Sequence, residues 1–304
     1  MSSKARIALL GAGLMGHGIA QVFAQNGHDV RIYDVDLAAR AGVKDRIRAN
    51  LRILGQDEGC VDRVTPAATI AEAVGAAEFI IEAVVEDLAA KQNLFTEVEN
   101  HAPADAILAS NTSVIPITQI MSGLRDGSRA LGTHWWNPPF LVPLVEVIRT
   151  ADSSDRAVEK TTALLTSVGK QPAEVKKDVP GFVGNRLQHA LWREAISLVE
   201  NGICDAETVD TVVKASFGRR LAVLGPLENA DLIGTDLTLA IHRTVLPAID
   251  HTAAALPYLE ALVAQGRLGM KSGEGFRTWN PDEQAALRNR VLLHLQRMKD
   301  MLDD

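Results

Sequence analysis

Short apolar runs alternate with longer amphipathic stretches over the first 180 residues of the chain. Turn-forming or polar residues bound each run, and the runs are Ile7–Leu10, Val30–Tyr33, Phe79–Ala83, Ile107–Ala109 and Ala130–Gly132. Their shortness favours strands over buried helices. The intervening stretches, such as Met15–Gln25 and Leu88–Val98, carry apolar residues at helical spacing. This alternation predicts an α/β domain whose parallel sheet is covered by helices on both faces.

The pattern changes at Val179-Pro180-Gly181. Beyond this point the strand-like runs stop, and an apolar stripe at helical spacing begins with Leu187, Leu191, Ala195 and Leu198. A chain of 304 residues is long enough for two domains that each bury a core. We therefore predict an α/β domain over residues 1–180 and an all-helical domain over residues 181–304.

The composition narrows the possible partners and surroundings. A hydrophobic share of 47% with 23% charged residues is ordinary for a soluble protein, and a net charge of −7 disfavours non-specific nucleic-acid binding. We expect no membrane span, because no run of about 18 apolar residues occurs, and no secretion signal at the N-terminus. Cys60 and Cys204 lie far apart without metal-ligand spacing, so we expect no disulfide framework, no metal site and a cytoplasmic location.

A glycine-rich turn lies between the first predicted strand and the first predicted helix. Its residues are Gly11, Ala12, Gly13, Leu14, Met15 and Gly16. The GxGxxG spacing alone is common, but a preceding strand and a following helix are the context that dinucleotide binding requires. The three glycines then allow a tight turn, close approach of a pyrophosphate, and close helix–strand packing, while the helix N-terminus offers free N–H groups. The sequence therefore predicts a Rossmann-type domain.

Asp34 follows the second predicted strand, where such domains place the acid that binds the adenine ribose. A carboxylate there accepts hydrogen bonds from ribose hydroxyls and repels a 2′-phosphate. No basic residue follows closely, so NAD is favoured over NADP as the cofactor. The alternative is that Asp34 simply caps the next helix.

His134 and Glu146 are the candidate reacting pair. His134 ends a predicted strand just before Asn137-Pro138-Pro139, which places it at the carboxyl edge of the sheet, where open α/β sheets bind ligands. An imidazole can remove a hydroxyl proton near neutral pH. Glu146, on the next predicted strand, could fix its tautomer. Taken singly, the two residues would be a buried structural histidine and a solvated strand glutamate. With the dinucleotide turn, they indicate alcohol oxidation by hydride transfer.

Several longer stretches match one known family. They are Gly11–Gly16, Ile81–Glu86, Ala109–Ser113, His134–Pro138, Pro180–Arg186 and Gly273–Phe276. On these motifs the chain resembles the L-3-hydroxyacyl-CoA dehydrogenase superfamily over nearly its full length. The resemblance implies an NAD-dependent alcohol oxidoreductase, with a helical domain that serves the substrate and dimerisation, and a homodimeric assembly.

The resemblance also implies roles for single residues. His134 matches the family's catalytic base and Glu146 its carboxylate partner, while Ser113 and Asn185 match polar residues that orient the substrate. The positions that match contacts to NAD are Gly11, Gly13, Leu14, Met15, Gly16, Asp34, Glu86, Lys91, Ser113 and Asn137. Without the resemblance, Lys91 would be interpreted as an exposed helix lysine and Ser113 as an ordinary turn residue.

Two segments depart from members that act on CoA thioesters. The segment from Ala38 to Val64 is shorter than the helical hairpin that helps those members hold CoA, and the turn from Phe217 to Pro226 is longer than theirs. With Asn137-Pro138-Pro139, this longer turn is more similar to a branch that includes L-gulonate 3-dehydrogenase (lambda-crystallin) and a dehydrogenase of pyridoxine degradation. Members of that branch oxidise small substrates that bear a carboxylate.

Arg220 lies in the longer turn and aligns with a basic residue of that branch. A guanidinium can hold a carboxylate through two parallel N–H bonds. We therefore expect a small hydroxy acid as the substrate, with Ser113, Asn185 and Arg220 as its contacts. The alternative is that Arg219 and Arg220 are simply solvated.

Other functions stay open at this point. A short-chain 3-hydroxyacyl-CoA dehydrogenase of fatty-acid metabolism could meet CoA phosphates with a basic set of Arg40, Lys44, Arg46, Arg48 and Arg52, although such residues commonly form a solvated helix face. A relative of 6-phosphogluconate dehydrogenase would need a lysine where Gly181 stands. A non-catalytic, crystallin-like protein would have no evident need for an ionisable pair at the sheet edge. Sequence alone also leaves open which of Trp135 and Trp136 packs inward.

Overall fold

The computed structural model describes residues 4–303, apart from the side chains of residues 300, 302 and 303. Within these bounds the chain divides into two compact units. Unit 1 runs to Asn185 and resumes at Leu292, and unit 2 spans Arg186–Val291. No helix among the described residues is long and apolar enough to span a membrane.

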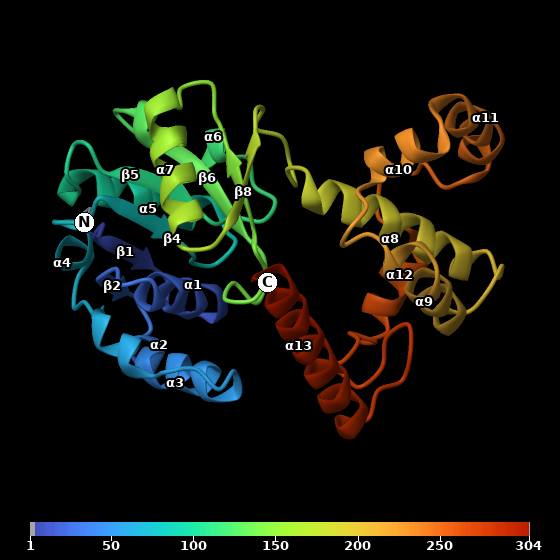
Figure 1. The fold of residues 1–304 in the computed structure, drawn as a ribbon, viewed down its shortest axis with the longest axis horizontal. Helices are drawn as coiled ribbons and strands as arrows, with labels where there is room; N and C mark the ends of the chain where they lie inside the picture. The colour runs from blue at the N-terminus through green and yellow to red at the C-terminus, as the bar shows by residue number, and fades with distance from the viewer. Residues whose placement is uncertain (1–3, 304) are drawn as a thin grey trace. The chain divides into compact units, whose positions relative to one another are not determined.

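Unit 1 is built on one eight-stranded sheet in the order β3-β2-β1-β4-β5-β6-β7-β8 (Figure 1). The strands are β1 Ile7–Leu10, β2 Val30–Tyr33, β3 Val64–Pro66, β4 Phe79–Glu82, β5 Ile107–Ser110, β6 Ala130–Trp135, β7 Leu144–Ile148 and β8 Gln171–Val175. All neighbours are parallel except β6 and β7, which are antiparallel. The order of the first six strands is that of a Rossmann domain, so the predicted fold class is confirmed.

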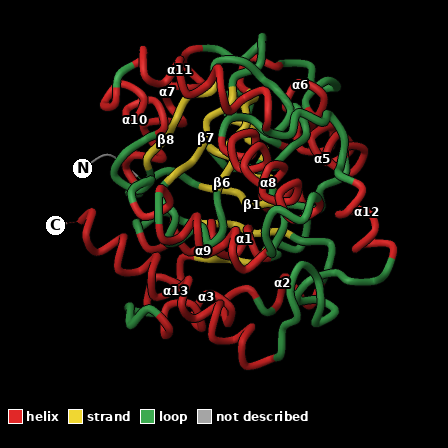
Figure 2. The backbone as a smooth tube through the Cα atoms, turned by 90° about the vertical axis from the view of Figure 1, so that its right-hand side faces the viewer, coloured by secondary structure: helices red, strands yellow, loops and turns green. Residues whose placement is uncertain are grey.

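Helices cover both faces of this sheet, because successive strand residues point to opposite sides. In β1, Ile7 and Leu9 belong to one buried cluster, while Ala8 and Leu10 belong to another. Figure 2 shows β6, β7 and β8 side by side, as their pairing requires. The helices and 3₁₀ turns are α1 Leu14–Gln25, α2 Leu37–Ala41, α3 Val43–Ile53, η1 Gly59–Arg63, α4 Ile70–Val74, α5 Leu88–His101, α6 Ile117–Ile120, η2 Gly127–Arg129 and α7 Asp155–Ser167.

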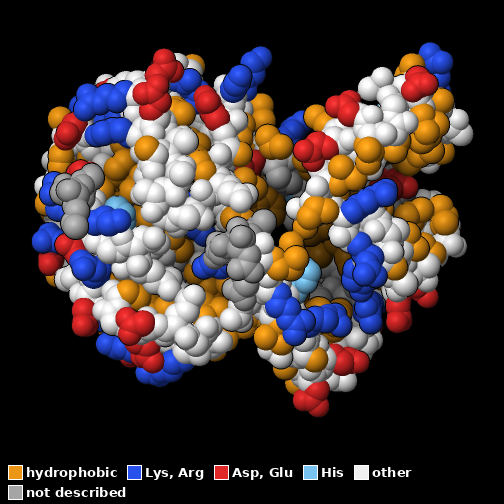
Figure 3. All heavy atoms as spheres, in the orientation of Figure 1, with side chains coloured by type: hydrophobic (Ala, Val, Ile, Leu, Met, Phe, Trp, Pro, Cys, Tyr) orange, Lys and Arg blue, Asp and Glu red, His pale blue; other side chains and the backbone are white. Residues whose placement is uncertain are grey.

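Unit 2 is helical, as predicted, and its apolar side chains are largely exposed. Its elements are α8 Gly184–Glu200, which begins in unit 1, α9 Ala206–Ala215, η3 Phe217–Arg219, α10 Pro226–Ile233, α11 Thr235–Val245, η4 Leu246–Ala248, α12 Pro257–Ala264 and the first part of α13 Pro281–Asp303. The structure describes all of residues 186–291, and only Ser197, Leu256, Leu262 and Gly275 among them are buried. Figure 3 shows apolar side chains, in orange, gathered on the surface of this unit.

Candidate active site

The glycine-rich turn joins β1 to α1 in a conformation that only glycine fits at two positions. Gly11 has a φ of +106°, and a Cβ added there would lie 2.4 Å from the Ala83 carbonyl oxygen. A Cβ added to Gly16 would lie 1.8 Å from the Gly11 carbonyl oxygen. At Gly13, by contrast, no atom lies within 4 Å of an added Cβ, and no side chain caps the helix that follows. The turn therefore packs tightly inward and presents an open backbone and free helix N–H groups to a phosphate.

Asp34 lies beside this turn at the end of β2. Its Oδ2 accepts the Ala12 N–H at 2.6 Å, and its Oδ1 accepts the Asp36 N–H at 2.8 Å. The cap of α2 is Asp36, whose carboxylate accepts the N–H groups of the first turn. The alternative interpretation of Asp34 as a helix cap is therefore wrong, because the next aspartate has that role. Each carboxylate oxygen of Asp34 keeps acceptor capacity for a ribose hydroxyl.

His134 and Glu146 meet because β6 and β7 run antiparallel and pair these two residues directly opposite each other. His134 Nδ1 lies 2.7 Å from Glu146 Oε2, and the two residues are only 4% and 2% exposed. The other carboxylate oxygen, Oε1, accepts the backbone N–H groups of Val183 and Gly184 at 2.9 and 3.1 Å. Three donors therefore converge on one buried carboxylate.

The same contacts fix the charge of Glu146. Burial alone would raise the pKa of its carboxyl group, but the hydrogen bonds from His134, Gly184 and Val183 outweigh burial and hold the pKa below its ordinary value. Glu146 is thus an anion at neutral pH and accepts the Nδ1–H of His134. This assignment leaves Nε2 of His134 as the ring atom that can take a proton.

The two consecutive tryptophans have different aromatic neighbours. Trp135 is buried in the core, where its ring lies 5.8 Å from that of Phe23. Trp136 instead lies beside His134, with 5.3 Å between the ring centroids. The ring centroid of Phe182 lies 5.6 Å from that of the same imidazole. Trp135 is therefore the inward-packing residue, and Trp136 forms a wall next to the proposed base.

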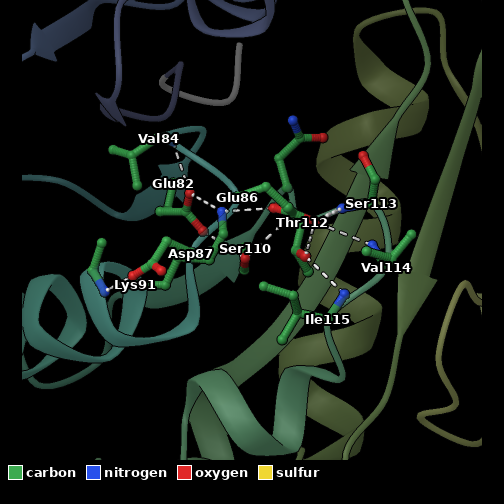
Figure 4. Close-up of polar contacts among 12 residues, drawn as sticks. Glu82, Val84, Glu86, Asp87, Lys91, Ser110, Thr112, Ser113, Val114 and Ile115 are labelled. Carbon is green, nitrogen blue, oxygen red and sulfur yellow. Dashed lines mark hydrogen bonds and ion pairs between the residues drawn. The ribbon is translucent and has the colours of Figure 1, made fainter. Parts of the chain in front are cut away.

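A second polar cluster follows the ends of β4 and β5 (Figure 4). Glu82 and Lys91 are 0% and 1% exposed, and Lys91 Nζ lies 2.6 Å from Glu82 Oε1. Lys91 Nζ also lies 3.2 Å from Glu86 Oε2. The hydroxyl of Ser110 donates to the other oxygen of Glu82 at 2.6 Å. Lys91 is thus a buried cation between two carboxylates, not the exposed helix lysine that its local pattern suggests.

Glu86 connects this cluster to the two residues expected to orient the substrate. Its Oε1 accepts the Thr112 hydroxyl at 2.6 Å and the Ser113 N–H at 2.8 Å (Figure 4). Asn185, at the start of α8, donates from Nδ2 to the Ser113 carbonyl oxygen at 2.8 Å. Burial raises the pKa of Glu86, but the bonds from Thr112 and Ser113, with the charge of Lys91, lower it further than burial raises it. The family resemblance assigned roles to Glu86, Lys91, Ser113 and Asn185. Glu82, Ser110 and Thr112 lie within the matched motifs Ile81–Glu86 and Ala109–Ser113 but were assigned no role.

Two expected site residues lie outside these clusters. Asn137 is exposed directly after β6, on the connection between the strands of His134 and Glu146. Arg220 is exposed in unit 2, directly after η3. No group of three or more metal-binding side chains occurs among the described residues.

Most of the basic set on α2 and α3 is already bonded within the protein. Arg40 donates to the Ala67 and Ala68 carbonyl oxygens, and Arg46 donates to those of Ala12 and Ala39. Arg48 pairs with Asp45, and Arg52 makes a two-pronged ion pair with Glu58 at 2.7 and 2.9 Å. The interpretation of these residues as a simply solvated helix face is therefore incomplete, because their guanidinium groups donate to backbone carbonyls or pair with neighbouring carboxylates.

A glycine-rich βα turn, an acid at the end of β2 and a buried His–Glu pair on one sheet are the features expected of an NAD-dependent alcohol oxidoreductase. The model of the 3-hydroxyacyl-CoA dehydrogenase NAD-binding domain matches residues 6–179, and the model of the C-terminal domain matches residues 181–279. The chain therefore belongs to the 3-hydroxyacyl-CoA dehydrogenase family.

Similar proteins in this family differ in the substrates that their names state. The chain is 34% identical to the 5-formyl-3-hydroxy-2-methylpyridine 4-carboxylate 5-dehydrogenase of Mesorhizobium japonicum, over 96% of this chain and 97% of that protein. It is 38% identical to a probable 3-hydroxybutyryl-CoA dehydrogenase of Bacillus subtilis, over 89% of this chain and 96% of that protein. A crystal structure of an NAD⁺-dependent 5-formyl-3-hydroxy-2-methylpyridine 4-carboxylic acid 5-dehydrogenase covers 99% of both chains with a TM-score of 0.92 and 32% identity.

Proposed function

We propose that His134 removes the hydroxyl proton of a small, carboxylate-bearing 3-hydroxy substrate, which the enzyme oxidises with NAD. The observation that carries this proposal is the 2.7 Å bond between His134 Nδ1 and Glu146 Oε2 in a buried setting. Because ionised Glu146 accepts the Nδ1 proton, His134 Nε2 keeps its lone pair for the substrate proton. Glu146 then stabilises the imidazolium that forms. When bound, NAD supplies the nicotinamide carbon that accepts the hydride.

The cofactor contacts are assigned to residues whose surroundings fit a dinucleotide. They are Gly11, Gly13, Leu14, Met15, Gly16, Asp34, Glu86, Lys91, Ser113 and Asn137. The open space beside Gly13 suits a pyrophosphate, and Asp34 suits the adenine ribose of NAD and repels the extra phosphate of NADP. Lys91 has three N–H donors, of which Glu82 and Glu86 occupy two. The residues present thus fit NAD.

Ser113 and Asn185 orient the substrate oxygen. Asn185 is fixed by its bond to the Ser113 carbonyl oxygen, which leaves its second amide N–H and the Ser113 hydroxyl as neutral donors. Neutral donors stabilise the developing carbonyl without competing with His134 for its proton.

The basic set supports a free acid over a CoA thioester as the substrate. Four of its five members, Arg40, Arg46, Arg48 and Arg52, already bond to backbone carbonyls or neighbouring carboxylates. Arg220 is exposed on unit 2, where its guanidinium is available to clamp a substrate carboxylate. The similar dehydrogenase of M. japonicum is named for a pyridine carboxylate, which is a small substrate of this chemical kind.

We also propose a cytoplasmic homodimer, in which residues 1–180 bind NAD and residues 181–304 serve the substrate and the dimer contact. An apolar stripe on α11, formed by Leu237, Ile241 and Val245, is exposed in the single chain and supports a partner copy. Cys60 and Cys204 are free thiols, which suits a reducing compartment.

The proposed function is tested by NADH formation. The purified enzyme is mixed with NAD and, separately, with L-gulonate, L-carnitine and free 3-hydroxybutyrate, and the same assays are repeated with NADP. We expect turnover of at least one free acid with NAD, and far less with NADP because of Asp34. No turnover of any free acid, together with turnover of 3-hydroxybutyryl-CoA, would replace this proposal by the fatty-acyl alternative, which the B. subtilis relative favours.

A further inference from the structure

Lys170 is a buried lysine that the proposed reaction does not use. It lies between α7 and β8 and is 7% exposed. Its Nζ donates to the carbonyl oxygens of Pro139 and Val142, the latter at 2.9 Å. The ammonium also lies 5.5 Å from the centroid of the Trp135 ring. No ion pair to Lys170 occurs among the residues that the structure describes.

The charge of this group is maintained at neutral pH in spite of its burial. Burial lowers the pKa of Lys170 to about 8, and repulsion by Lys299 adds to the effect. An ammonium without a carboxylate partner is costly inside a protein, and two carbonyl oxygens with an aromatic face offset that cost. An apolar side chain at this position could not donate the hydrogen bonds that Lys170 makes, which suggests that these bonds have a function.

Both carbonyl acceptors lie in one segment, Trp136–Pro143, which connects β6 to β7. This connecting segment joins the strand of His134 to the strand of Glu146 and carries Asn137 near its start. It also packs on the dinucleotide helix, because a Cβ added to Gly18 of α1 would lie 2.6 Å from Pro139 Cγ. Lys170 therefore fixes the connecting segment through hydrogen bonds, and the missing side chain of Gly18 lets Pro139 pack against α1.

We propose that Lys170 is a positioning residue that fixes the connecting segment against α1, and thereby sets Asn137 for NAD and His134 for Glu146. The inference rests on the proposed function, because it takes Asn137 as a cofactor contact. Lys170 acts through the backbone of Pro139 and Val142, with its ammonium over the Trp135 ring.

The first test is Lys170→Met, which keeps a long side chain but removes the donors and the charge. Because a small displacement near a reacting centre is costly, we expect the Kd for NADH and the KM for NAD to rise about 10-fold and kcat to fall about 10-fold. The KM for the hydroxy acid should stay within about 2-fold, since Ser113 and Asn185 are held by other contacts. Lys170→Arg, which restores donors and charge, should recover part of the NADH affinity. Lys177→Met, at an exposed lysine beyond β8, is the matched control.

A second variant reaches the same segment from the other side. Gly18→Ala should displace Pro139 and raise the Kd for NADH in the same way. The double variant should lose less affinity than the product of the two single losses, because both act on one segment. Fluorescence titration of NADH keeps the two proposals apart: if wild-type protein binds no NADH, the cofactor site itself is wrong. Wild-type NADH affinity in Lys170→Met, or a large loss of Tm with equal losses in both KM values, would overturn the positioning role.

Discussion

The two units of this chain bury their apolar residues to very different degrees. In unit 1, β1, β4, β5 and β6 are buried along their whole length, and two clusters fill the two faces of the sheet. In unit 2, which the structure describes completely, four residues are buried and helices expose leucine, isoleucine and valine side chains. Unit 1 therefore forms a buried apolar core within a single chain, and unit 2 has no such core.

This difference explains where the polar chemistry is placed. Glu146 and Lys91 keep their charges inside unit 1 because fixed donors and acceptors replace water around them. Each exposed aliphatic side chain of unit 2 could contribute about 1.5–3 kcal/mol if it were buried. We infer that unit 1 supplies the reaction and that unit 2 supplies the surface for a second copy.

The largest expected effect is the loss of the base in unit 1. His134→Ala should lower kcat by about 10²- to 10⁴-fold, because the substrate proton has no acceptor, while NADH binding stays near the wild-type level. Steady-state kinetics and NADH titration measure the two quantities, with His101→Ala at an exposed position as the control. Turnover close to wild type in His134→Ala would remove the histidine from the reaction.

The next effect concerns the missing core of unit 2. Ile241→Asp places a charge in the α11 stripe and should weaken self-association by about 100-fold or more, because the charge would be buried without a partner. Sedimentation velocity over a concentration series measures the effect. Leu37→Asp changes an equally apolar exposed residue of unit 1 and should leave association unchanged. A monomeric wild-type protein would contradict the inferred role of unit 2.

A smaller effect is expected on substrate KM, and it should differ between the neighbouring residues Arg220 and Arg219. Arg220→Ala should raise the KM for a free hydroxy acid by about 10-fold and leave the KM for its uncharged ester nearly unchanged, because only the acid offers a carboxylate to the guanidinium. Arg219→Ala, one residue earlier on the same exposed turn, should change neither value. Equal effects of Arg220→Ala on acid and ester would show that Arg220 is not the carboxylate clamp.

The smallest effect is a pH dependence of stability in unit 1. Burial, with a smaller contribution from Arg46, holds the pKa of His17 below its ordinary 6.5, so the folded state prefers the neutral ring. Its contribution is fully present above pH 6.5 and is lost as the pH falls through the lower pKa of the folded state. His17→Gln should therefore flatten the decline in the free energy of unfolding between pH 7.5 and 5, measured by urea denaturation. An unchanged slope would mean that His17 is not protonated on unfolding.

Much of unit 1 could be predicted from the sequence, because buried strands are short apolar runs. β8 was not predicted, since most of Gln171–Val175 is exposed and carries no apolar pattern, and β3 has only three residues. The sequence suggested that Glu146 could contact His134. It did not predict that the two residues lie directly opposite each other, because β6 and β7 pair antiparallel in a sheet that was expected to be parallel. The burial of Lys91 did not, because a helix pattern cannot show that Glu82 lies inside the protein opposite it. The inward turn of Trp135 likewise depends on packing against Phe23, which is distant in sequence.

We propose that this family member oxidises a free hydroxy acid rather than a CoA thioester. The most direct test is the ratio of kcat/KM for free 3-hydroxybutyrate to that for 3-hydroxybutyryl-CoA, measured with NAD under the same conditions. We predict a ratio above one, because four of the five residues of the basic set are bonded within the protein and Arg220 is available to a carboxylate. A ratio far below one would contradict the free acid as substrate and make the thioester the substrate.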